Sequence, residues 1–328
     1  MERSNSLEFA GNMTAQEIAS PDLSVIIVNH NTRDLVTMCI RSIYAETKAI
    51  RYEIILVDNA STDGSVAAIQ KQFPEVRVIA NTANLGFPEA NNYAIPLARG
   101  RYILLLNSDT LILDQALDRM VAFMDQHPEV GITGPKMYDA EMRPWRYEMW
   151  FPSPALYLLQ PLLLHFWGDI GDREVDWVPG ACLMIRRCVI DQIGLLDTFM
   201  FGEDVDWCFR AKKAGWRIFH LGQARIIHYW GATATAPDKI AGRVFGGHQA
   251  KLYYALKHFG KWGYFSLSLI IGLKALIKLL ILAVQQAFAA PQSAQGLRGQ
   301  MIGYRRLLAV LVSNRILSED KEWWKKRD

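Results

Sequence analysis

The sequence predicts an α/β fold with a mostly parallel sheet, and three observations support this prediction. Short continuous apolar runs, typical of strands buried on both faces, recur at residues 23–28, 53–57 and 102–106. Stretches with apolar residues at helical spacing lie between these runs. Polar residues follow each run directly. Strands that alternate with helices favour parallel pairing through right-handed crossovers.

Turn residues divide the chain into its expected elements. The first half is expected to form strands at 23–28, 53–57, 76–80 and 102–106, with helices at 34–47, up to Phe73, and after Asn84–Phe87. In the second half, residues 175–185 indicate two strands around a Pro179-Gly180 turn, and residues 217–221 and 225–227 indicate two more. A helix is expected to start at Glu203, just after Gly202.

The composition is that of a globular protein. Of the 328 residues 51% are apolar, and the net charge of +3 is too small to indicate nucleic-acid binding. The four cysteines are scattered without metal-type pairs, which indicates a reducing compartment and no zinc site. Residues 1–20 are polar and lack the apolar core of a signal peptide. We therefore expect a flexible extension on a chain that begins in the cytoplasm.

Polar side chains follow three of the expected strands: Asn29 with His30, Asp58, and Asn107 to Asp109. Each ending alone could be an ordinary turn. At one edge of a parallel sheet they would line a crevice, where open α/β sheets bind ligands. The Asp109 carboxylate beside Asn and Ser suits a hard divalent cation. Because a dinucleotide fingerprint and a Walker loop are absent, the pattern favours a nucleotide held by side chains and a metal.

Four motifs in this order resemble those of the family-2 inverting glycosyltransferases, most closely the bacterial rhamnosyltransferase-like branch. They are Ser24-Val-Ile-Ile-Val-Asn-His-Asn31, Val57-Asp-Asn-Ala-Ser-Thr-Asp-Gly64, Asn84-Leu-Gly-Phe87 and Leu106-Asn-Ser-Asp-Thr110. The resemblance covers residues 23–235 and implies a GT-A fold, that is, a Rossmann-like, mostly parallel sheet that binds a nucleotide-sugar donor.

The resemblance also implies a donor site. Asp58 is expected to hydrogen-bond the nucleobase, Asn107 to lie near the ribose, and Asp109 to bind a divalent cation, Mg²⁺ or Mn²⁺, that bridges the diphosphate. The family signature is often Asp-x-Asp, and Asn107 here replaces its first acid. The remaining residues expected around the donor are Asn29, His30, Asn84, Gly86, Asn91 and Ser108.

The acceptor side is expected in the second half. Glu203, Asp204 and Asp206 fill the first turn of a helix, where the helix dipole alone would favour acids. Asp206 can pair with Arg210 four residues on, whereas Asp204 points elsewhere. By resemblance Asp204 is the general base. Glu203 and Asp206 are expected to orient the acceptor or brace the helix.

Three further features belong to this side. By resemblance, Trp177 to Gly180 face the acceptor, and His228 after the last strand completes the metal or diphosphate site; the alternative is an ordinary packed histidine. Residues 145–167 are aromatic, apolar and interrupted by proline. They form either a buried helical insertion or a lid that touches lipid, and they are too short to span a bilayer.

Helices are expected at 248–258, 262–288 and 296–317. The apolar stretch 262–288 contains Lys274 and Lys278, and its longest charge-free run, 262–273, is short of the ~20 residues that a span needs. We therefore expect helices that lie in the membrane surface, followed by a basic tail with Trp323 and Trp324. A soluble helical cap or a homodimer interface is the alternative.

These observations predict an inverting glycosyltransferase. The expected donor is a dTDP- or UDP-sugar, with rhamnose favoured, and the expected acceptor is a lipid-linked saccharide of a cell-surface polysaccharide. The expected organisation is a domain at 21–235, with a donor half at 21–135 and an acceptor half at 136–235, followed by a membrane-associating region at 236–328. The expected location is the cytoplasmic face of a bacterial inner membrane, as a peripheral or monotopic protein. The alternatives are a nucleotidyltransferase and an inactive membrane-bound scaffold that binds a nucleotide sugar.

Overall fold

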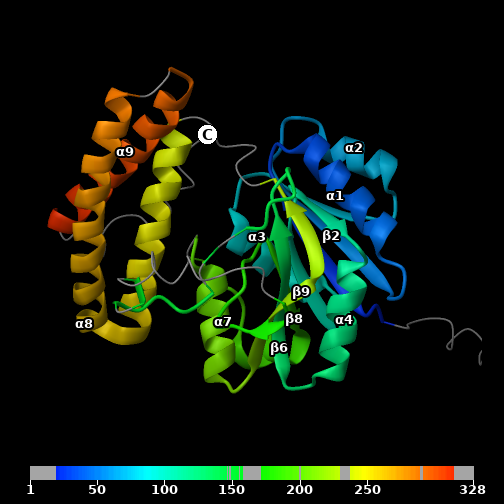
Figure 1. Ribbon diagram of the computed structural model, residues 1–328. Coiled ribbons are helices and arrows are strands. Elements are labelled where there is room, and N and C mark those ends of the chain that lie inside the picture. The colour runs from blue at the N-terminus through cyan, green and yellow to red at the C-terminus, as the bar shows by residue number, and fades with distance from the viewer. Residues whose placement is uncertain are drawn as a thin grey trace, which may run out of the picture.

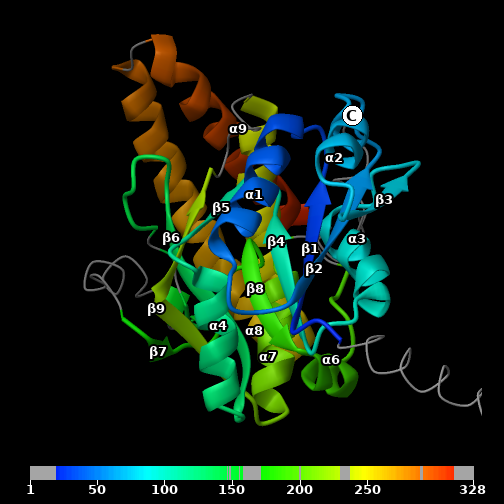
Figure 2. The same cartoon turned by 90° about the vertical axis from the view of Figure 1, so that its right-hand side faces the viewer.

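A mixed sheet of nine strands forms the centre of the molecule (Figures 1 and 2). The computed structural model describes residues 20–145, 147, 149–154, 156–157, 171–198, 201–229, 237–288 and 291–313. The strands are β1 (Leu23–Asn29), β2 (Tyr52–Asn59), β3 (Arg77–Asn81), β4 (Tyr102–Asn107), β5 (Thr110–Leu113), β6 (Val130–Tyr138), β7 (Arg173–Glu174), β8 (Cys182–Arg186) and β9 (Arg217–His228). Their order is β3-β2-β1-β4-β8-β6-β9-β5, and β7 pairs with β9.

The first half of the sheet is parallel, as the sequence predicts. β1 pairs with β2 and β4, and the register places Asn29 opposite Asp58 and Val28 opposite Asn107. The polar endings of these three strands therefore lie at one edge. The prediction of a mostly parallel sheet does not extend to the second half, because β8 runs antiparallel to both β4 and β6. This reversal pairs Cys182, at the start of β8, with Leu106, so the loop that precedes β8 opens at the same edge.

Helices cover both faces of the sheet and bury one apolar core on each. One face carries α1, α2 and α4, and the other carries α3, α6 and α7. The α1 stripe of Val36, Cys39, Ile40 and Ile43 is fully buried, at about 1.5–3 kcal/mol for each large aliphatic side chain. The helices are α1 (Arg33–Glu46), α2 (Ser65–Gln72), α3 (Phe87–Ala94), η1 (Ile95–Leu97), α4 (Ala116–Gln126), α6 (Arg187–Ile193) and α7 (Glu203–Lys213).

Two predicted elements differ in the structure. The strands expected at 217–221 and 225–227 are one continuous strand, β9, whose register against β6 shifts between Pro135 and Lys136. The irregularity absorbs the residues between the two apolar runs without ending the strand. The strand expected before Pro179 is absent, and residues 175–180 form a loop. That loop is held at its start by the Val175 N–H, which donates to the Ile218 carbonyl over 2.9 Å.

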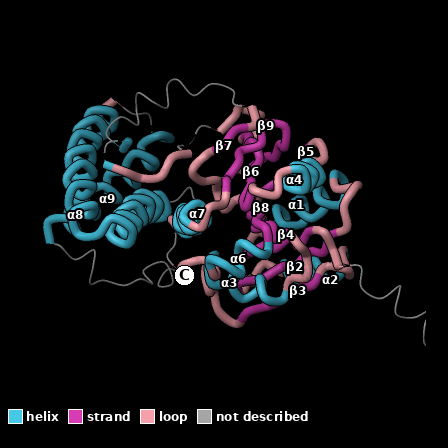
Figure 3. The backbone as a smooth tube through the Cα atoms, turned by 90° about the horizontal axis from the view of Figure 1, so that it is seen from below, coloured by secondary structure: helices cyan, strands magenta, loops and turns pink. Residues whose placement is uncertain are grey.

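The two C-terminal helices form a separate layer with its own core. α8 (Pro237–Ala287) is bent at Gly260, which has a φ of 66°, and α9 (Pro291–Ser313) packs along it. Figures 1 and 3 show this layer beside the α/β domain, with α7 between α8 and the sheet. The helices expected at 248–258 and 262–288 are thus the two arms of α8, whose first arm begins earlier than predicted. Trp323 and Trp324 lie outside the described residues.

The second arm of α8 leaves an apolar stripe exposed. Its most exposed members are Trp262 (83%), Leu269 (68%) and Leu280 (70%). By length and composition α8 is long and apolar enough to cross a membrane, and 22% of its most apolar 18-residue window is buried. The lysines of the stretch do not all point to solvent: the Lys274 ammonium lies 4.1 Å from the centre of the Tyr157 ring and donates to the Tyr157 carbonyl.

Candidate active site

A cavity of about 610 Å³ opens where the sheet edge, α7 and α8 meet. Asn107 ends β4, Asp109 follows it, and His228 ends β9. The loop before β8 supplies Trp177 and Gly180, and the start of α7 supplies Glu203 and Asp204. Seven of the residues that the sequence singles out thus line one cavity: Asn107, Asp109, Trp177, Gly180, Glu203, Asp204 and His228.

At one end of the cavity a carboxylate and an imidazole face each other. The register of β5 on β9 pairs Thr110 with His228 and so places His228 beside Asp109. The Asp109 Oδ1 atom lies 3.2 Å from the His228 Nε2 atom, and the Asn107 Nδ2 atom lies 3.3 Å from the same nitrogen. Both side chains are largely withdrawn from water, at 17% exposure for Asp109 and 9% for His228.

This corner fits a hard divalent cation. Asp109 and His228 offer one carboxylate and one imidazole close together, and no group of three or more His, Cys, Asp or Glu gathers as a ligand set among the described residues. Mg²⁺ and its relatives commonly use one or two protein ligands and take the rest from substrate phosphates and water. A cation that completes its shell with a diphosphate would therefore be held by these two side chains.

A second carboxylate, that of Asp204, is held by backbone groups across the cavity. The Gly180 N–H donates to Oδ2 over 2.9 Å and the Val205 N–H donates to Oδ1 over 2.8 Å. Gly180 and Asp204 lie in direct contact, since a Cβ at position 180 would be at an ordinary van der Waals distance of 3.6 Å from the Cβ of Asp204. Burial raises the pKa of Asp204, and the two backbone donors partly oppose this shift.

The neighbouring Glu203 is 7% exposed and accepts from the Gly202 N–H over 2.9 Å. Burial and the negative charge of Asp204 raise the pKa of Glu203 to about 8. The two adjacent carboxyls share one desolvated site, in which the pKa of each is raised, and they differ in their partners: Asp204 accepts from the Gly180 N–H across the cavity wall, whereas Glu203 accepts from the Gly202 N–H.

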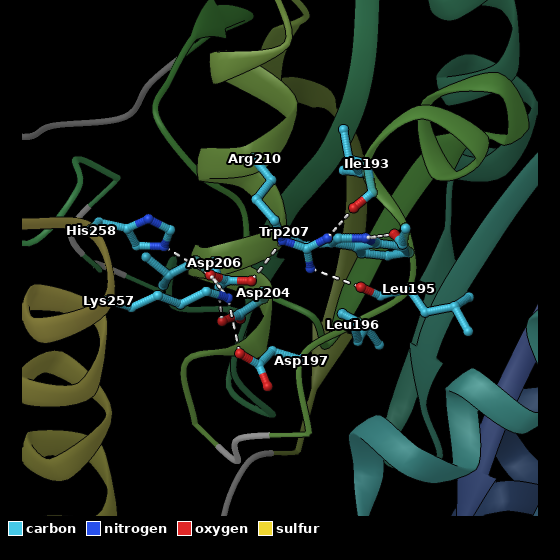
Figure 4. Close-up of polar contacts among 12 residues, drawn as sticks. Ile193, Leu195, Leu196, Asp197, Asp204, Asp206, Trp207, Arg210, Lys257 and His258 are labelled. Atoms are coloured by element: carbon cyan, nitrogen blue, oxygen red, sulfur yellow. Dashed lines mark hydrogen bonds and ion pairs between the residues drawn. The ribbon is translucent and has the colours of Figure 1, made fainter. Parts of the chain in front are cut away.

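Asp206 faces away from the cavity and joins α7 to α8 (Figure 4). Its Oδ1 atom lies 2.6 Å from Lys257 Nζ and 2.8 Å from His258 Nε2, and its Oδ2 atom accepts from Arg210 Nε over 2.8 Å. Burial alone would raise the pKa of Asp206, but these partners outweigh it and hold the pKa below its ordinary value. Of the two roles expected for Asp206, these contacts support the brace and not the orientation of the acceptor.

The residues expected around the nucleotide lie at the β1–β2 edge and hydrogen-bond to one another. The Asn29 amide donates to Asp58 Oδ1 over 2.7 Å, and the Ser61 N–H donates to Asp58 Oδ2 over 2.8 Å. Asp58 is 1% exposed, so both of its oxygens are already used inside the protein. Ser108 lies 2.9 Å from Thr32, and this contact links the network to β4.

The other expected donor residues have different surroundings. His30 is exposed, and its Nδ1 atom lies 2.7 Å from the Asn59 carbonyl. Asn84 accepts from the Gly86 N–H over 2.9 Å, which fixes the turn into α3, where Gly86 has a φ of 78°. Asn91 is fully buried, and its Oδ1 atom has no hydrogen-bond partner among the described residues. None of these four residues lines the cavity.

Aromatic rings and α8 complete the wall. Trp177 donates to the Trp150 carbonyl over 3.1 Å, and the Trp145 ring centre lies 6.1 Å from that of His228. Residues 158–170 of the aromatic stretch lie outside the described chain, whereas Tyr157 is buried in the core of α8 and α9. Sequence reasoning did not find the wall that α8 contributes: Arg243, Gly247, Ala250, Lys251 and Tyr254. Their spacing along one helix face was the available signal.

Comparison with known proteins agrees with this geometry. Residues 24–191 match the family model described as glycosyl transferase family 2. An N-acetylglucosaminyl-diphospho-decaprenol L-rhamnosyltransferase of Mycobacterium tuberculosis is 26% identical over 235 residues, which cover 64% of this chain and 76% of that protein. The low-salt glycan biosynthesis hexosyltransferase Agl10 of Haloferax volcanii is 26% identical over 219 residues, covering 65% of this chain and 67% of that protein.

Solved structures show the same fold. The mannosyltransferase PcManGT from Pyrobaculum calidifontis, in complex with GDP-Man and Mn²⁺, superposes with a TM-score of 0.57 at 16% identity, covering 97% of this chain and 94% of that one. The S. aureus TarS 1-349 structure in complex with UDP gives a TM-score of 0.50 at 18% identity, covering 89% and 92%. The family model spans just over half of the chain, and this protein is a glycosyltransferase of family 2 with the GT-A fold.

Proposed function

We propose that this glycosyltransferase inverts the sugar that it transfers, with Asp204 as the general base. The observation that carries the proposal is that Asp204 and the Asp109–His228 pair line one cavity from two different sides. The raised pKa of Asp204 makes its carboxylate a better proton acceptor, and the Gly180 and Val205 N–H groups fix its direction. Asp204 accepts the proton of an acceptor hydroxyl while that oxygen attacks the anomeric carbon from the face opposite the nucleotide.

The leaving diphosphate lies at the Asp109–His228 corner in this proposal. Asp109 and His228 hold a divalent cation there, Mg²⁺ or Mn²⁺, which when bound offsets the negative charge that grows on the diphosphate. The Asn107 amide lies 3.3 Å from His228 Nε2 and belongs to the same corner, where its carboxamide would face the bound diphosphate. A structural neighbour that binds a nucleotide sugar together with Mn²⁺ supports this part.

The donor and the acceptor are proposed from the relatives. The M. tuberculosis relative is named for L-rhamnose and for a diphospho-decaprenol acceptor. We favour a dTDP- or UDP-sugar donor, with rhamnose first, and a lipid-linked saccharide acceptor in glycan synthesis. The 21–235 domain carries Asp204 and the Asp109–His228 corner, and the 236–328 region completes the cavity wall and holds the domain on the membrane.

Membrane association has support from the second arm of α8. Its exposed stripe of Trp262, Leu269 and Leu280 gains roughly 25 cal/mol for each Å² of apolar surface removed from water. One face of the second arm packs in the core that it shares with the first arm and α9, where Leu267, Ile271 and Ala275 are buried, so a position of its other face in the membrane surface fits better than a span. The cytoplasmic face of a bacterial inner membrane is the proposed location.

The experiment is a turnover assay with detergent-solubilised full-length protein, dTDP-rhamnose or a UDP-sugar, Mg²⁺ or Mn²⁺, and bacterial lipid extract. We expect nucleoside diphosphate to be released only when lipid extract is present, and EDTA to stop the release. Pyrophosphate as product would indicate a nucleotidyltransferase instead. Donor binding without turnover under every condition would indicate an inactive scaffold. Turnover that EDTA leaves unchanged would contradict the role of the Asp109–His228 corner.

A further inference from the structure

The first arm of α8 presents two cations to the active-site cavity. Arg243, Gly247, Ala250, Lys251 and Tyr254 all line it, at the three- and four-residue spacings of one helix face. Arg243 and Lys251 are eight residues apart, which corresponds to about 12 Å along a helix axis. They are the α8 cations on the cavity wall within the part of the chain that the structure describes.

The helix surface at Gly247, between the two cations, is open among the described residues. A Cβ added at Gly247 would meet no heavy atom of these residues within 4 Å, so none of their side chains requires a glycine there. Glycine in a helix interior is less favourable than alanine by roughly 0.5–1 kcal/mol. Gly247 therefore forms a gap on the cavity wall, between Arg243 on one side and Lys251 on the other.

Both cations are partly withdrawn from water. Burial lowers the pKa of the Arg243 guanidinium, which means that its charge is incompletely solvated. The Lys251 ammonium lies 4.8 Å from the centre of the Tyr157 ring, a contact that helps to hold the side chain in place. An anion at the gap would recover part of the solvation that both groups lose on burial.

The cations lie on the side of the cavity that holds Asp204. α8 packs directly on the turn before it, since a Cβ on Gly202 would lie 3.1 Å from the Cβ of Ala250. The Asp109–His228 corner comes instead from the sheet edge. A group bound at Gly247 therefore approaches from the side of the base, which is the side of the acceptor in the proposed reaction.

We propose that Arg243 and Lys251 bind the diphosphate that joins the acceptor sugar to its lipid. This inference rests on the proposed function, because it takes Asp204 as the base that meets the acceptor. The diphosphate lies over Gly247, the sugar reaches inward to Asp204, and the lipid leaves toward the exposed stripe of the second arm of α8. One helix thus provides both the anion-binding wall and the apolar surface that the two ends of such an acceptor require.

The test uses full-length protein in detergent, with farnesyl diphosphate as the acceptor probe and farnesol as its neutral counterpart. Calorimetry is done with the metal present and with UDP or dTDP, whichever the wild type binds, at saturation, so that the donor site is filled. We expect farnesyl diphosphate to bind and farnesol to bind far more weakly. The double variant R243M/K251M is expected to bind farnesyl diphosphate at least tenfold more weakly, as for the loss of charged hydrogen bonds, with nucleotide affinity unchanged.

The charge control is Lys261→Met, which removes one positive charge from α8, beside the Gly260 bend and away from the cavity wall; it is compared with the single variants R243M and K251M as well as with the double variant. It should bind farnesyl diphosphate like the wild type. Gly247→Leu serves if the double variant is unstable, because it fills the gap and removes no charge. We expect it to block farnesyl diphosphate and to leave nucleotide binding intact.

Several results would overturn the inference. Loss of nucleotide affinity in R243M/K251M would assign the two cations to the donor diphosphate. Unchanged farnesyl diphosphate binding in both R243M/K251M and Gly247→Leu, or equal binding of farnesol by the wild type, would remove the site. If the wild type turns over donor with lipid extract and still fails to bind farnesyl diphosphate, this inference fails while the proposed function stands. If it binds no nucleotide at all, the proposed function fails.

Discussion

The two faces of α7 carry carboxylates in opposite environments. On the cavity face Asp204 is held by backbone N–H groups, and burial raises its pKa. On the α8 face Asp206, two residues on, is surrounded by Arg210, Lys257 and His258, which hold its pKa low. Each residue of a helix is rotated by about 100° from the one before it. Asp204 and Asp206, two residues apart, therefore point in nearly opposite directions, Asp204 to the cavity and Asp206 to α8.

This difference separates a reactive acid from a structural one. A carboxylate that three cationic or hydrogen-bonding side chains surround is poor at accepting a proton, because its charged form is already stabilised. A carboxylate with backbone donors alone and a desolvated setting accepts a proton readily. Three substitutions test whether the cavity face of α7 carries the reactive acid and the α8 face the structural one.

The first is Asp204→Asn, which keeps the size of the side chain and removes its basicity. We expect transfer to fall on the order of 10²- to 10⁴-fold, because the acceptor hydroxyl loses its proton acceptor. Nucleotide affinity, measured by calorimetry, should stay near that of the wild type. Transfer at a normal rate by this variant would contradict the role of Asp204 as base.

The second is Asp206→Ala, which leaves the cations of the α7–α8 contact without their acid. Removing one partner of a buried ion pair costs about 3–5 kcal/mol, and we expect the lower end, since the Lys257 side chain keeps 31% exposure. Denaturant unfolding measures this loss. Because the pKa of Asp206 is depressed in the folded protein, its carboxylate stabilises the fold fully above the unfolded-state pKa, which is near 3.8. This stabilisation is lost as the pH falls through the pKa of the folded protein.

The rate of sugar transfer by Asp206→Ala shows whether Asp206 braces α7 against α8 or contacts the substrate. The folded fraction of Asp206→Ala should bind nucleotide normally and keep most of its turnover. A collapse of kcat with unchanged unfolding would mean that Asp206 touches the acceptor after all, and the contrast between the two faces of α7 would then fail.

The third is Glu203→Gln, which keeps an acceptor for the Gly202 N–H and removes the titration. In the wild type the folded protein keeps the Glu203 proton up to about pH 8, whereas the unfolded chain releases it near 4.5. Wild-type stability should therefore fall between these two pH values relative to the variant. Thermal unfolding midpoints from pH 4 to pH 9 measure this. Parallel curves for the two proteins would show that Glu203 is not protonated in the fold.

Much of the sheet edge could be predicted from the sequence, because buried strands and their polar endings are local patterns. Asn29, Asp58 and Asn107 lie together as expected, since β1, β2 and β4 are parallel neighbours. The directions in which these side chains point could not be predicted in the same way. Both Asp58 carboxylate oxygens accept hydrogen bonds inside the protein, from Asn29 and Ser61, and such contacts depend on distances between segments that the sequence does not give.

The helical wall of the cavity could not be predicted from local patterns. Arg243 and Lys251 reach the cavity because the first arm of α8 packs on Gly202 and because Lys257 and His258 hold it to Asp206. These are contacts between distant segments, and they fix which face of α8 turns inward. The sequence predicts helix only from Gly246 onward, so the turn that carries Arg243 lies outside the expected helical region.

The bend at Gly260 sets the angle between the cavity wall on the first arm of α8 and the exposed apolar stripe on the second arm. Its φ of 66° lies where a glycine is tolerated and most other residues are strained. The first arm is locked to α7, and the second arm carries the exposed apolar stripe. If that stripe lies in lipid as proposed, the bend at Gly260 sets the tilt of the cavity mouth relative to the bilayer and the height of the cavity mouth above the bilayer. In the proposed orientation, the angle at Gly260 therefore fixes how far an acceptor sugar must extend from the headgroup plane to meet Asp204.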